Sequence, residues 1–387
     1  MKIAFITNLV NHHQIPLADE FYSMLGDNYA YIACEPLPDW LIKGGYDPSL
    51  DRPYIIRTYK CKEEMSRARK LIDESDVVII GSAPDDFIEN RLKDNKLTFR
   101  YAERYFKSRP WYFPDPRVFI SFYKKHFRYR NKNLYLLAAS AYTANDVYHM
   151  HCYKDKVYKW GYFTRVDNFA LGACRKLFTS SAESTPHIMW CSRFLRWKHP
   201  ELPIMLAERL KAKGYHFSID MYGSGEELEN TKQLASKLDV EDVVTFCGNL
   251  PNDQILIKMR ESEIFLFSSD KSEGWGAVLN ESMSNGCAVV ASNMIGAAPF
   301  LIKDGENGLL FISENIDSLE EKVCYLFDHP QERIRIAKEA IISIRNNWSP
   351  TIAAQRFISL AERLMHNSDS DFKYGPCSKA FPYKSKL

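Results

Sequence analysis

Two glutamates separated by seven residues, Glu273 and Glu281, flank a turn and helix that follow a short apolar run. The turn contains Gly274 and Gly276, so its backbone N–H groups can approach an anion closely. The helix expected after the turn directs its positive end at the same place. A carboxylate repels phosphate, but it accepts two hydrogen bonds from the neighbouring hydroxyls of a ribose or hexose. The segment therefore predicts a site for a diphosphate joined to a sugar.

Two cations and two further turns precede this segment. Arg193 and Lys198 are five positions apart after another apolar run, so both charges can converge on one diphosphate. The turn Gly223-Ser-Gly225 follows the next apolar run, and the turn at Gly248 follows the one after that. We expect the Gly248 turn to present backbone groups to a nucleotide base, whereas Gly223 and Gly225 either bind ligand or only form a tight turn.

A fourth polar turn lies near the N-terminus. It contains Asn11, His12, His13 and Gln14, directly after the first expected strand. Ligands of open parallel sheets bind at the carboxyl ends of the strands, so we expect these four side chains to face a ligand. One histidine ring can instead pack against the sheet.

The elements that must position these residues are short β-rich runs alternating with helical patterns. Alternation of this kind predicts βαβ units and parallel sheets covered on both faces. The expected strands are Lys2–Thr7, Tyr29–Ala33, Tyr54–Thr58, Asp76–Gly81, Asn133–Ala139 and Lys156–Trp160, then His187–Ser192, His216–Tyr222, Val243–Cys247, Glu263–Ser268, Cys287–Ser292 and Gly308–Phe311.

A chain of 387 residues is long enough for two domains. We expect an α/β protein of two facing, doubly wound, Rossmann-like domains with ligands in the cleft between them. The predicted domains are residues 1–180 and 181–350, joined by the small polar segment Thr179–Pro186. Residues 351–366 are expected to form a helix that packs back on the first domain, followed by a loose polar tail at 367–387.

In order and spacing, the pair Arg193 and Lys198, the turns at Gly223 and Gly248, and the two glutamates together resemble the donor domain of retaining GT-B glycosyltransferases of family 4. The resemblance covers roughly residues 188 to 365. It implies a metal-independent hexosyltransferase with no cofactor. A nucleoside diphosphate sugar would be the co-substrate, with a UDP-sugar favoured over a GDP-sugar.

The resemblance also implies individual roles. Arg193 and Lys198 would hold the diphosphate, Glu281 the ribose, and Glu273 the transferred sugar, so that Glu273, Arg193 and Lys198 form the catalytic set. The backbone of Gly274, Trp275, Gly276 and Ala277 would cap sugar or phosphate, and Gly223 and Gly248 would belong to the donor site. Many family members have adjacent glycines in the first turn, whereas this chain has Asn11, His12, His13 and Gln14, which we assign to the acceptor side without individual roles.

Residues 100–132 are unusually basic and aromatic, with ten Lys or Arg, eleven aromatic residues and two acids. Aromatic rings beside cations suit the interface of an anionic membrane. The alternative is that helices of the first domain bury the rings and solvate the cations. Together with a looser resemblance to bacterial capsule and O-antigen transferases, the segment favours a cytoplasmic protein at the inner face of the membrane.

Composition excludes other classes. A net charge of +2 argues against a nucleic-acid binder. The nine cysteines form no CxxC pair, which argues against a zinc site or a disulfide framework. No HExxH spacing is present, so we expect no metal site. The predicted function is sugar transfer from a nucleoside diphosphate sugar to a hydroxyl of a glycan or lipid-linked oligosaccharide in cell-surface polysaccharide synthesis. A nucleotide-sugar epimerase on the same fold and a non-catalytic nucleotide-sugar-binding subunit are the alternatives.

Overall fold

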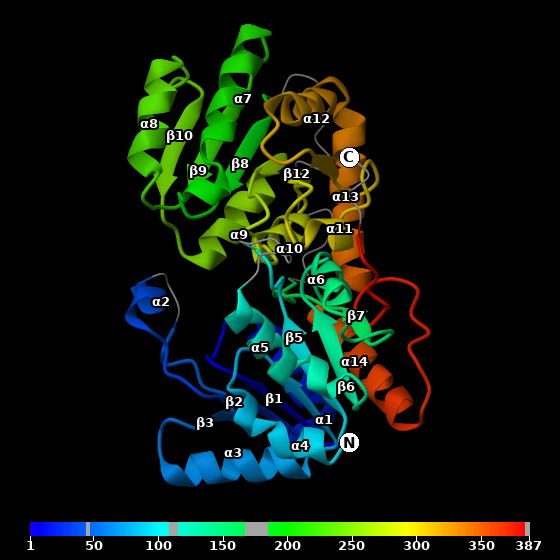
Figure 1. Ribbon diagram of the computed structural model, residues 1–387. Helices are drawn as coiled ribbons and strands as arrows, with labels where there is room; N and C mark the ends of the chain where they lie inside the picture. Colours follow the sequence, from blue (N-terminus) through cyan, green and yellow to red (C-terminus); the bar gives the residue numbers. More distant parts are fainter. Residues whose placement is uncertain (44–46, 108–114, 167–184, 384–387) are drawn as a thin grey trace. The chain divides into compact units, whose positions relative to one another are not determined.

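The computed structural model describes residues 1–43, 47–107, 115–166 and 185–383. The chain divides into two compact units, which are Met1–Arg165 with Asn347–Tyr383, and Val166–Asn346 with Lys384–Leu387. Each unit contains one parallel sheet with helices packed around it (Figure 1). The boundaries lie near 165 and 346, where the sequence predicts 180 and 350; most of the expected linker Thr179–Pro186 lies outside the described residues.

The first unit is built on seven strands. They are β1 (Ile3–Thr7), β2 (Tyr29–Ala33), β3 (Ile55–Arg57), β4 (Val77–Ile80), β5 (Thr98–Ala102), β6 (Leu134–Ala138) and β7 (Val157–Lys159). Its helices are α1 (Ile15–Leu25), α2 (Asp39–Lys43), α3 (Lys62–Glu74), α4 (Glu89–Lys93), α5 (Pro116–Lys125), α6 (Thr143–His149) and α14 (Pro350–Met365).

The second unit is built on six strands. They are β8 (His187–Cys191), β9 (Ser218–Tyr222), β10 (Val244–Gly248), β11 (Ile264–Phe267), β12 (Ala288–Ser292) and β13 (Leu309–Phe311). The helices that follow them are α7 (Glu201–Ala212), α8 (Leu228–Lys237), α9 (Asn252–Glu261), α10 (Ala277–Ser284), α11 (Ala298–Leu301), α12 (Ile316–Asp328) and α13 (Pro330–Asn347).

Both sheets are doubly wound. Their strand orders are β3-β2-β1-β4-β5-β6-β7 and β10-β9-β8-β11-β12-β13. In each sheet the chain winds outward in one direction and then returns to wind outward in the other. The direction changes between β1 and β4 in the first sheet, and between β8 and β11 in the second. Crevices that bind ligands form at such points, outside the carboxyl ends of the strands.

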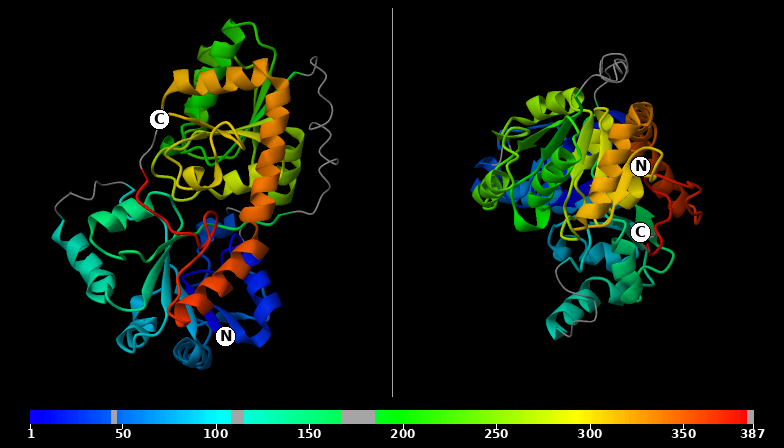
Figure 2. Two further views of the ribbon diagram at one scale, coloured as in Figure 1. Left: turned by 90° about the vertical axis from the view of Figure 1, so that its right-hand side faces the viewer. Right: turned by 90° about the horizontal axis from the view of Figure 1, so that it is seen from above.

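The C-terminal helix α14 packs on the first unit, as the sequence predicts. Phe357 lies at its centre and is fully buried. The ring centroid of Phe357 is 5.6 Å from Phe21 of α1, 4.9 Å from Phe99 of β5 and 5.6 Å from Trp160. Burying large rings of this kind contributes about 1.5–3 kcal/mol each. The predicted fold of two Rossmann-like domains with a returning helix is therefore confirmed, and Figure 2 shows α14 against the first unit from a second side.

Two sequence expectations about this unit are wrong. Thr98–Ala102 forms β5 between β4 and β6, although it was not expected to be a strand. The tail after Asn367 was expected to be loose, but its backbone bonds to β7. The N–H of Lys159 donates to the Ser378 carbonyl at 2.8 Å, the N–H of Cys377 donates to the Lys159 carbonyl at 2.8 Å, and Cys377 is fully buried. Residues 384–387 of that tail lie outside the described part.

Among the described residues, no helix combines the length and apolar character needed to cross a lipid bilayer.

Candidate functional site

A buried ion pair lies where the second sheet changes direction. Lys198 ends a short 3-10 helix, Arg196–Lys198, in the loop after β8, and its ammonium group contacts the Glu273 carboxylate in the loop after β11. The two side chains are 10% and 11% exposed. The Lys198 ammonium also lies 4.2 Å from the Trp197 ring centroid and 5.7 Å from that of Phe267. These contacts hold one positive charge at the carboxyl end of β11.

Ser268 fixes the backbone of this pair. Its hydroxyl donates to the Lys198 carbonyl at 2.7 Å and accepts from the Trp190 indole N–H at 2.9 Å. Both Ser268 and Trp190 are buried, so the hydrogen bonds compete little with water. The loop that carries Lys198 is therefore tied to the end of β11.

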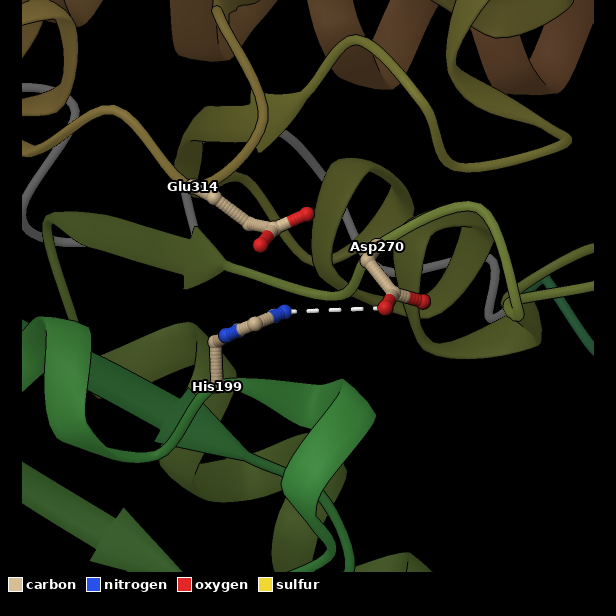
Figure 3. Close-up of side chains that lie close together, drawn as sticks. All are labelled: His199, Asp270 and Glu314. Atoms are coloured by element: carbon tan, nitrogen blue, oxygen red, sulfur yellow. Dashed lines mark ion pairs between the residues drawn. The ribbon is translucent and has the colours of Figure 1, made fainter.

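His199 makes a second link between the same two loops (Figure 3). Its Nδ1 lies 2.7 Å from the Glu201 carboxylate, and its Nε2 lies 3.7 Å from Asp270. The ligand atoms of His199, Asp270 and Glu314 all lie within 4.8 Å of one another. Burial lowers the pKa of His199, but the hydrogen bond that the ring donates to Glu201 and the charges of Glu201, Glu314 and Asp270 outweigh burial and raise the pKa above its usual value. A protonated imidazole among carboxylates accounts for this arrangement.

The glycine turn leads into α10 as predicted. Gly276 precedes the helix with φ of 91°, and a Cβ there would lie 2.6 Å from the Phe267 ring. Gly274 is buried. The N–H groups of Ala277 and Val278 precede the first backbone hydrogen bond of α10, which the Leu279 N–H donates to the Gly276 carbonyl at 2.9 Å. Trp275 is also buried, and its indole N–H donates to the Asn280 side chain at 2.9 Å. At the Trp275 position, only the backbone is therefore suited to contact a ligand.

Glu281 lies on α10 and is 8% exposed. One of its carboxylate oxygens accepts a hydrogen bond from the Asn252 amide at 3.2 Å. Asn252 begins α9 and lies four residues after the exposed Gly248 turn, so its hydrogen bond connects the segment that follows β10 to Glu281 on α10. The sequence analysis missed Asn252, although its position directly after Pro251 at a helix start was a visible signal.

Cys191, at the end of β8, has a thiol that is affected by the charges of both Glu281 and Lys198. Burial raises the pKa of its thiol to about 12, the Glu281 charge adds to that effect and Lys198 opposes it. The thiol is therefore neutral near pH 7.

The turn containing Gly223 and Gly225 has a packing role. The two glycines have φ of 133° and 153°, and a Cβ at these positions would lie 1.9 Å from the Ser192 carbonyl oxygen and 2.3 Å from that of Phe194. Only glycine allows this backbone contact. The turn thereby supports the loop that carries Arg193, whose own side chain is exposed. Arg193 and Lys198 thus differ, because only Lys198 is buried and paired with Glu273.

The first unit contains a cavity of about 550 Å³ at the corresponding place in its sheet. The cavity lies at the carboxyl ends of β1, β4 and β5, and Asn11 and Gln14 line it. The Tyr31 hydroxyl donates to the Gln14 side chain at 2.7 Å, and the Asn11 side-chain oxygen accepts from the His13 N–H at 3.0 Å. The structure therefore brings two of the four predicted acceptor-side residues to a cavity wall.

The two histidines of the first turn pack against each other and remain neutral near pH 7. Their ring centroids are 3.9 Å apart. Burial, followed by the charge of His12, lowers the pKa of His13 to about 3, and burial also lowers the pKa of His12. The His13 ring is 6.2 Å from that of Tyr162, which lines the cavity. Packing beside the cavity is therefore their observed role.

Comparison with solved structures defines the fold class. A glycosyltransferase from Rickettsia africae superposes with a TM-score of 0.67 at 17% identity, over 95% of this chain and 99% of that one. The Anabaena protein HepE, crystallised with UDP, superposes with a TM-score of 0.67 at 14% identity, over 93% and 99% of the two chains. The protein has the GT-B fold.

Sequence comparison supports a family for the second half of the chain. Residues 178–342 match the family described as glycosyl transferases group 1. An uncharacterised glycosyltransferase from Haemophilus influenzae is 31% identical over 130 residues, which is 33% of this chain and 36% of that protein. This chain covers only 36% and 45% of the lengths of the first two relatives that match it.

Proposed function

We propose that the second unit binds a nucleoside diphosphate sugar and that the protein transfers the sugar to an acceptor hydroxyl. The observation that carries the proposal is the Lys198–Glu273 pair at the β8/β11 change of direction. Glu273 precedes α10, which carries Glu281 with its partner Asn252. A cation, free helix N–H groups and two carboxylates there match the parts of such a donor. The group 1 match over residues 178–342 supports the same assignment.

In this proposal each residue has one task. Glu281, oriented by Asn252, accepts hydrogen bonds from the ribose hydroxyls, and Glu273 orients the transferred sugar. Lys198 and the N-terminal amides of α10 stabilise the negative charge that grows on the leaving diphosphate. Arg193, exposed on the same loop, supplies a second cation when the donor is bound.

The finer features are also proposals. They are family 4 membership, transfer of a hexose with retained configuration, and independence of metal. Retention would proceed through a short-lived oxocarbenium ion, with the leaving phosphate oxygen accepting the proton of the attacking hydroxyl, so no separate base is required. A UDP-sugar is favoured as donor, which the UDP complex of the structural relative HepE supports.

The acceptor is proposed to be a glycan or lipid-linked oligosaccharide of cell-surface polysaccharide synthesis, such as a capsule or O-antigen. The large cavity of the first unit supports an acceptor position there. A cytoplasmic protein that contacts the inner membrane surface through α5 is part of the same proposal. Helix α5 exposes Val118, Phe119, Ile120 and Tyr123 beside Lys124, which supports contact with an anionic bilayer.

The test is calorimetric titration of UDP, GDP, ADP and CMP without metal into the wild type and Glu281→Ala. The exposed Glu229→Ala variant is the matched control. Binding of one nucleotide that Glu281→Ala weakens supports the donor site, and an unchanged dissociation constant contradicts the ribose role. Product analysis with donor alone then distinguishes an epimerase from a transferase, and donor turnover with a cell-envelope lipid extract distinguishes a transferase from a non-catalytic subunit. Equal turnover with EDTA and with added Mn²⁺ tests metal independence.

A further inference from the structure

An arginine that lines the cavity of the first unit has two guanidinium nitrogens without a hydrogen-bond partner among the described residues. The Arg104 side chain is 19% exposed. Its Nε and Nη1 atoms are buried and make no hydrogen bond to the described residues. Its nearest carboxylate, Asp146, lies 3.7 Å from Nε. A guanidinium without hydrogen-bond partners is costly inside a protein, because its donors have lost water and gained nothing.

The Asp146 carboxylate already accepts two backbone hydrogen bonds. Its Oδ2 atom accepts the N–H groups of Tyr105 at 2.8 Å and Phe106 at 3.2 Å. These bonds fix the loop that follows β5. The Arg104 guanidinium also lies 5.0 Å from the Tyr142 ring centroid, so one face is held by an aromatic ring. Arg104 is thus held in place at a cavity wall, while the Nε and Nη1 donors of its planar fork have no hydrogen-bond partner among the described residues.

The cavity as a whole is lined by more positively than negatively charged side chains. Arg100, Arg104, Lys107 and Lys125 line it, against Asp85 and Glu103. Asp85 is shared, since it lies 2.7 Å from Arg100 and 3.6 Å from Lys125.

The remaining acidic group is similarly engaged. Glu103 pairs with Lys107 and accepts the Tyr162 hydroxyl at 3.0 Å. His126 does not add to the charge, because burial and the nearby Arg100 and Lys125 lower its pKa to about 2. The four cations are therefore incompletely neutralised by the carboxylates that line the cavity.

We propose that this cavity is an oxyanion subsite, in which Arg104 binds a phosphate, diphosphate or carboxylate group of the acceptor. An oxyanion accepts the two parallel hydrogen bonds that the guanidinium fork offers and supplies the missing negative charge. The volume of about 550 Å³ exceeds what a phosphate needs and leaves room for an attached sugar. The identity of the anion's carrier as an acceptor rests on the proposed function, whereas the anion site itself does not.

The oxyanion can come from two sources, the diphosphate of a lipid-linked acceptor or the carboxylate of an acidic sugar. Inorganic pyrophosphate and glucuronate are the respective probes, each titrated calorimetrically into the full chain saturated with UDP. UDP fills the proposed donor site, so that added pyrophosphate reports on the first unit. The variants are Arg104→Gln and the control Arg117→Gln, whose side chain is 90% exposed on α5.

We expect at least one probe to bind the wild type and Arg117→Gln with equal affinity. Arg104→Gln should bind that probe at least about tenfold more weakly. Pyrophosphate as that probe indicates a diphosphate acceptor, and glucuronate an acidic sugar. Binding of neither probe, or equal binding by the wild type and Arg104→Gln, overturns the proposal. If UDP itself does not bind, the donor proposal fails separately, and the titrations are repeated in Lys198→Ala, which lacks the buried cation of the second unit.

A measurement on the wild type guards against loss of folding in Arg104→Gln. Phenylglyoxal modifies accessible arginines, and mass spectrometry of the peptides reports each site. We expect the binding probe to slow modification of Arg104 and to leave Arg117 unaffected. Modification of Arg104 at the same rate with and without both probes contradicts the oxyanion subsite.

Discussion

Lys198 and Glu273 form a buried ion pair that joins the loop after β8 to the loop after β11, where the second sheet changes direction. A lysine and a glutamate 75 positions apart are therefore one structural unit. In the proposed donor complex, the lysine turns toward a diphosphate and the glutamate toward a sugar hydroxyl. The pair thus keeps both groups oriented and mutually neutralised in the absence of ligand.

The first prediction concerns the strength of this pair. Removing one partner leaves a buried charge uncompensated, so Lys198→Met and Glu273→Gln should each lower the free energy of unfolding by about 3 kcal/mol. The double variant should lose less than the two single losses together, with a coupling of about 1–3 kcal/mol. Urea denaturation of the four proteins measures this coupling.

The control for this cycle is the pair Lys211 and Asp242. The Lys211 ammonium nitrogen lies 2.8 Å from a carboxylate oxygen of Asp242, but the Lys211 and Asp242 side chains are 39% and 59% exposed. Solvent screens such a pair, so its coupling should be below about 1 kcal/mol. Equal coupling in the two cycles would show that burial does not strengthen the Lys198–Glu273 contact.

Separately, Lys198→Ala should lower turnover more than its stability loss at the assay temperature explains.

The second prediction separates Glu281 from its partner Asn252. Glu281→Ala should weaken UDP binding by about 1–3 kcal/mol, since two hydroxyl hydrogen bonds are lost. Asn252→Ala should weaken binding less, because the carboxylate remains and loses only an orienting bond of 3.2 Å. Calorimetric dissociation constants for both variants test this order. A larger loss in Asn252→Ala would mean that the asparagine itself contacts the nucleotide.

Much of the second unit was predictable because the sequence signals that specify it are local. Every strand from β8 to β13 was expected within two residues of its observed ends, since continuous apolar runs mark strands of a covered parallel sheet. Glycine spacing similarly identified the turns, although the packing of Gly223 against Ser192 depends on a neighbouring strand. The ion pair of Lys198 with Glu273 could not be predicted, because spacing does not reveal which side chains meet across a sheet.

The first unit was harder for a physical reason. Thr98–Ala102 contains Arg100, so it lacks the continuous apolar run of its neighbours, and the basic aromatic segment of residues 100–132 begins within it. In the structure it is β5, and the loop after it carries Arg104 into the cavity. The alternative of buried rings is borne out for Phe122 and Tyr129, which are buried. Part of that segment, including Trp111, lies outside the described residues.

The third prediction is a pH dependence centred on His199. Its folded pKa lies above 6.5, so the protonated form is stabilised by folding. That contribution should be complete below about pH 6.5 and should disappear as pH rises through the folded pKa. Compared with the wild type, His199→Gln should therefore lose most stability near pH 5.5 to 6 and least near pH 8.5. Urea denaturation across this range measures the difference.

The direction of this difference is the test. His329→Gln, at an exposed histidine on the same unit, is the matched control variant. A stability difference between wild type and His199→Gln that grows as pH rises would mean that neutral His199 is the stabilising form. That result would contradict an imidazolium held among Glu201, Asp270 and Glu314.

The last prediction concerns the exposed face of α5. Phe119, Ile120 and Tyr123 are 43%, 54% and 55% exposed on one helix, with Lys124 beside them. If this face enters an anionic bilayer, the double variant Phe119→Ser with Ile120→Ser should no longer sediment with vesicles that contain phosphatidylglycerol. Lys124→Gln should weaken the sedimentation.

Tyr148→Ser, at a 65% exposed aromatic residue on α6, is the control that should sediment as the wild type does. A wild type that stays in the supernatant at low ionic strength would contradict membrane contact through α5. Equal loss in Tyr148→Ser would mean that general surface hydrophobicity, and not this helix, drives the association.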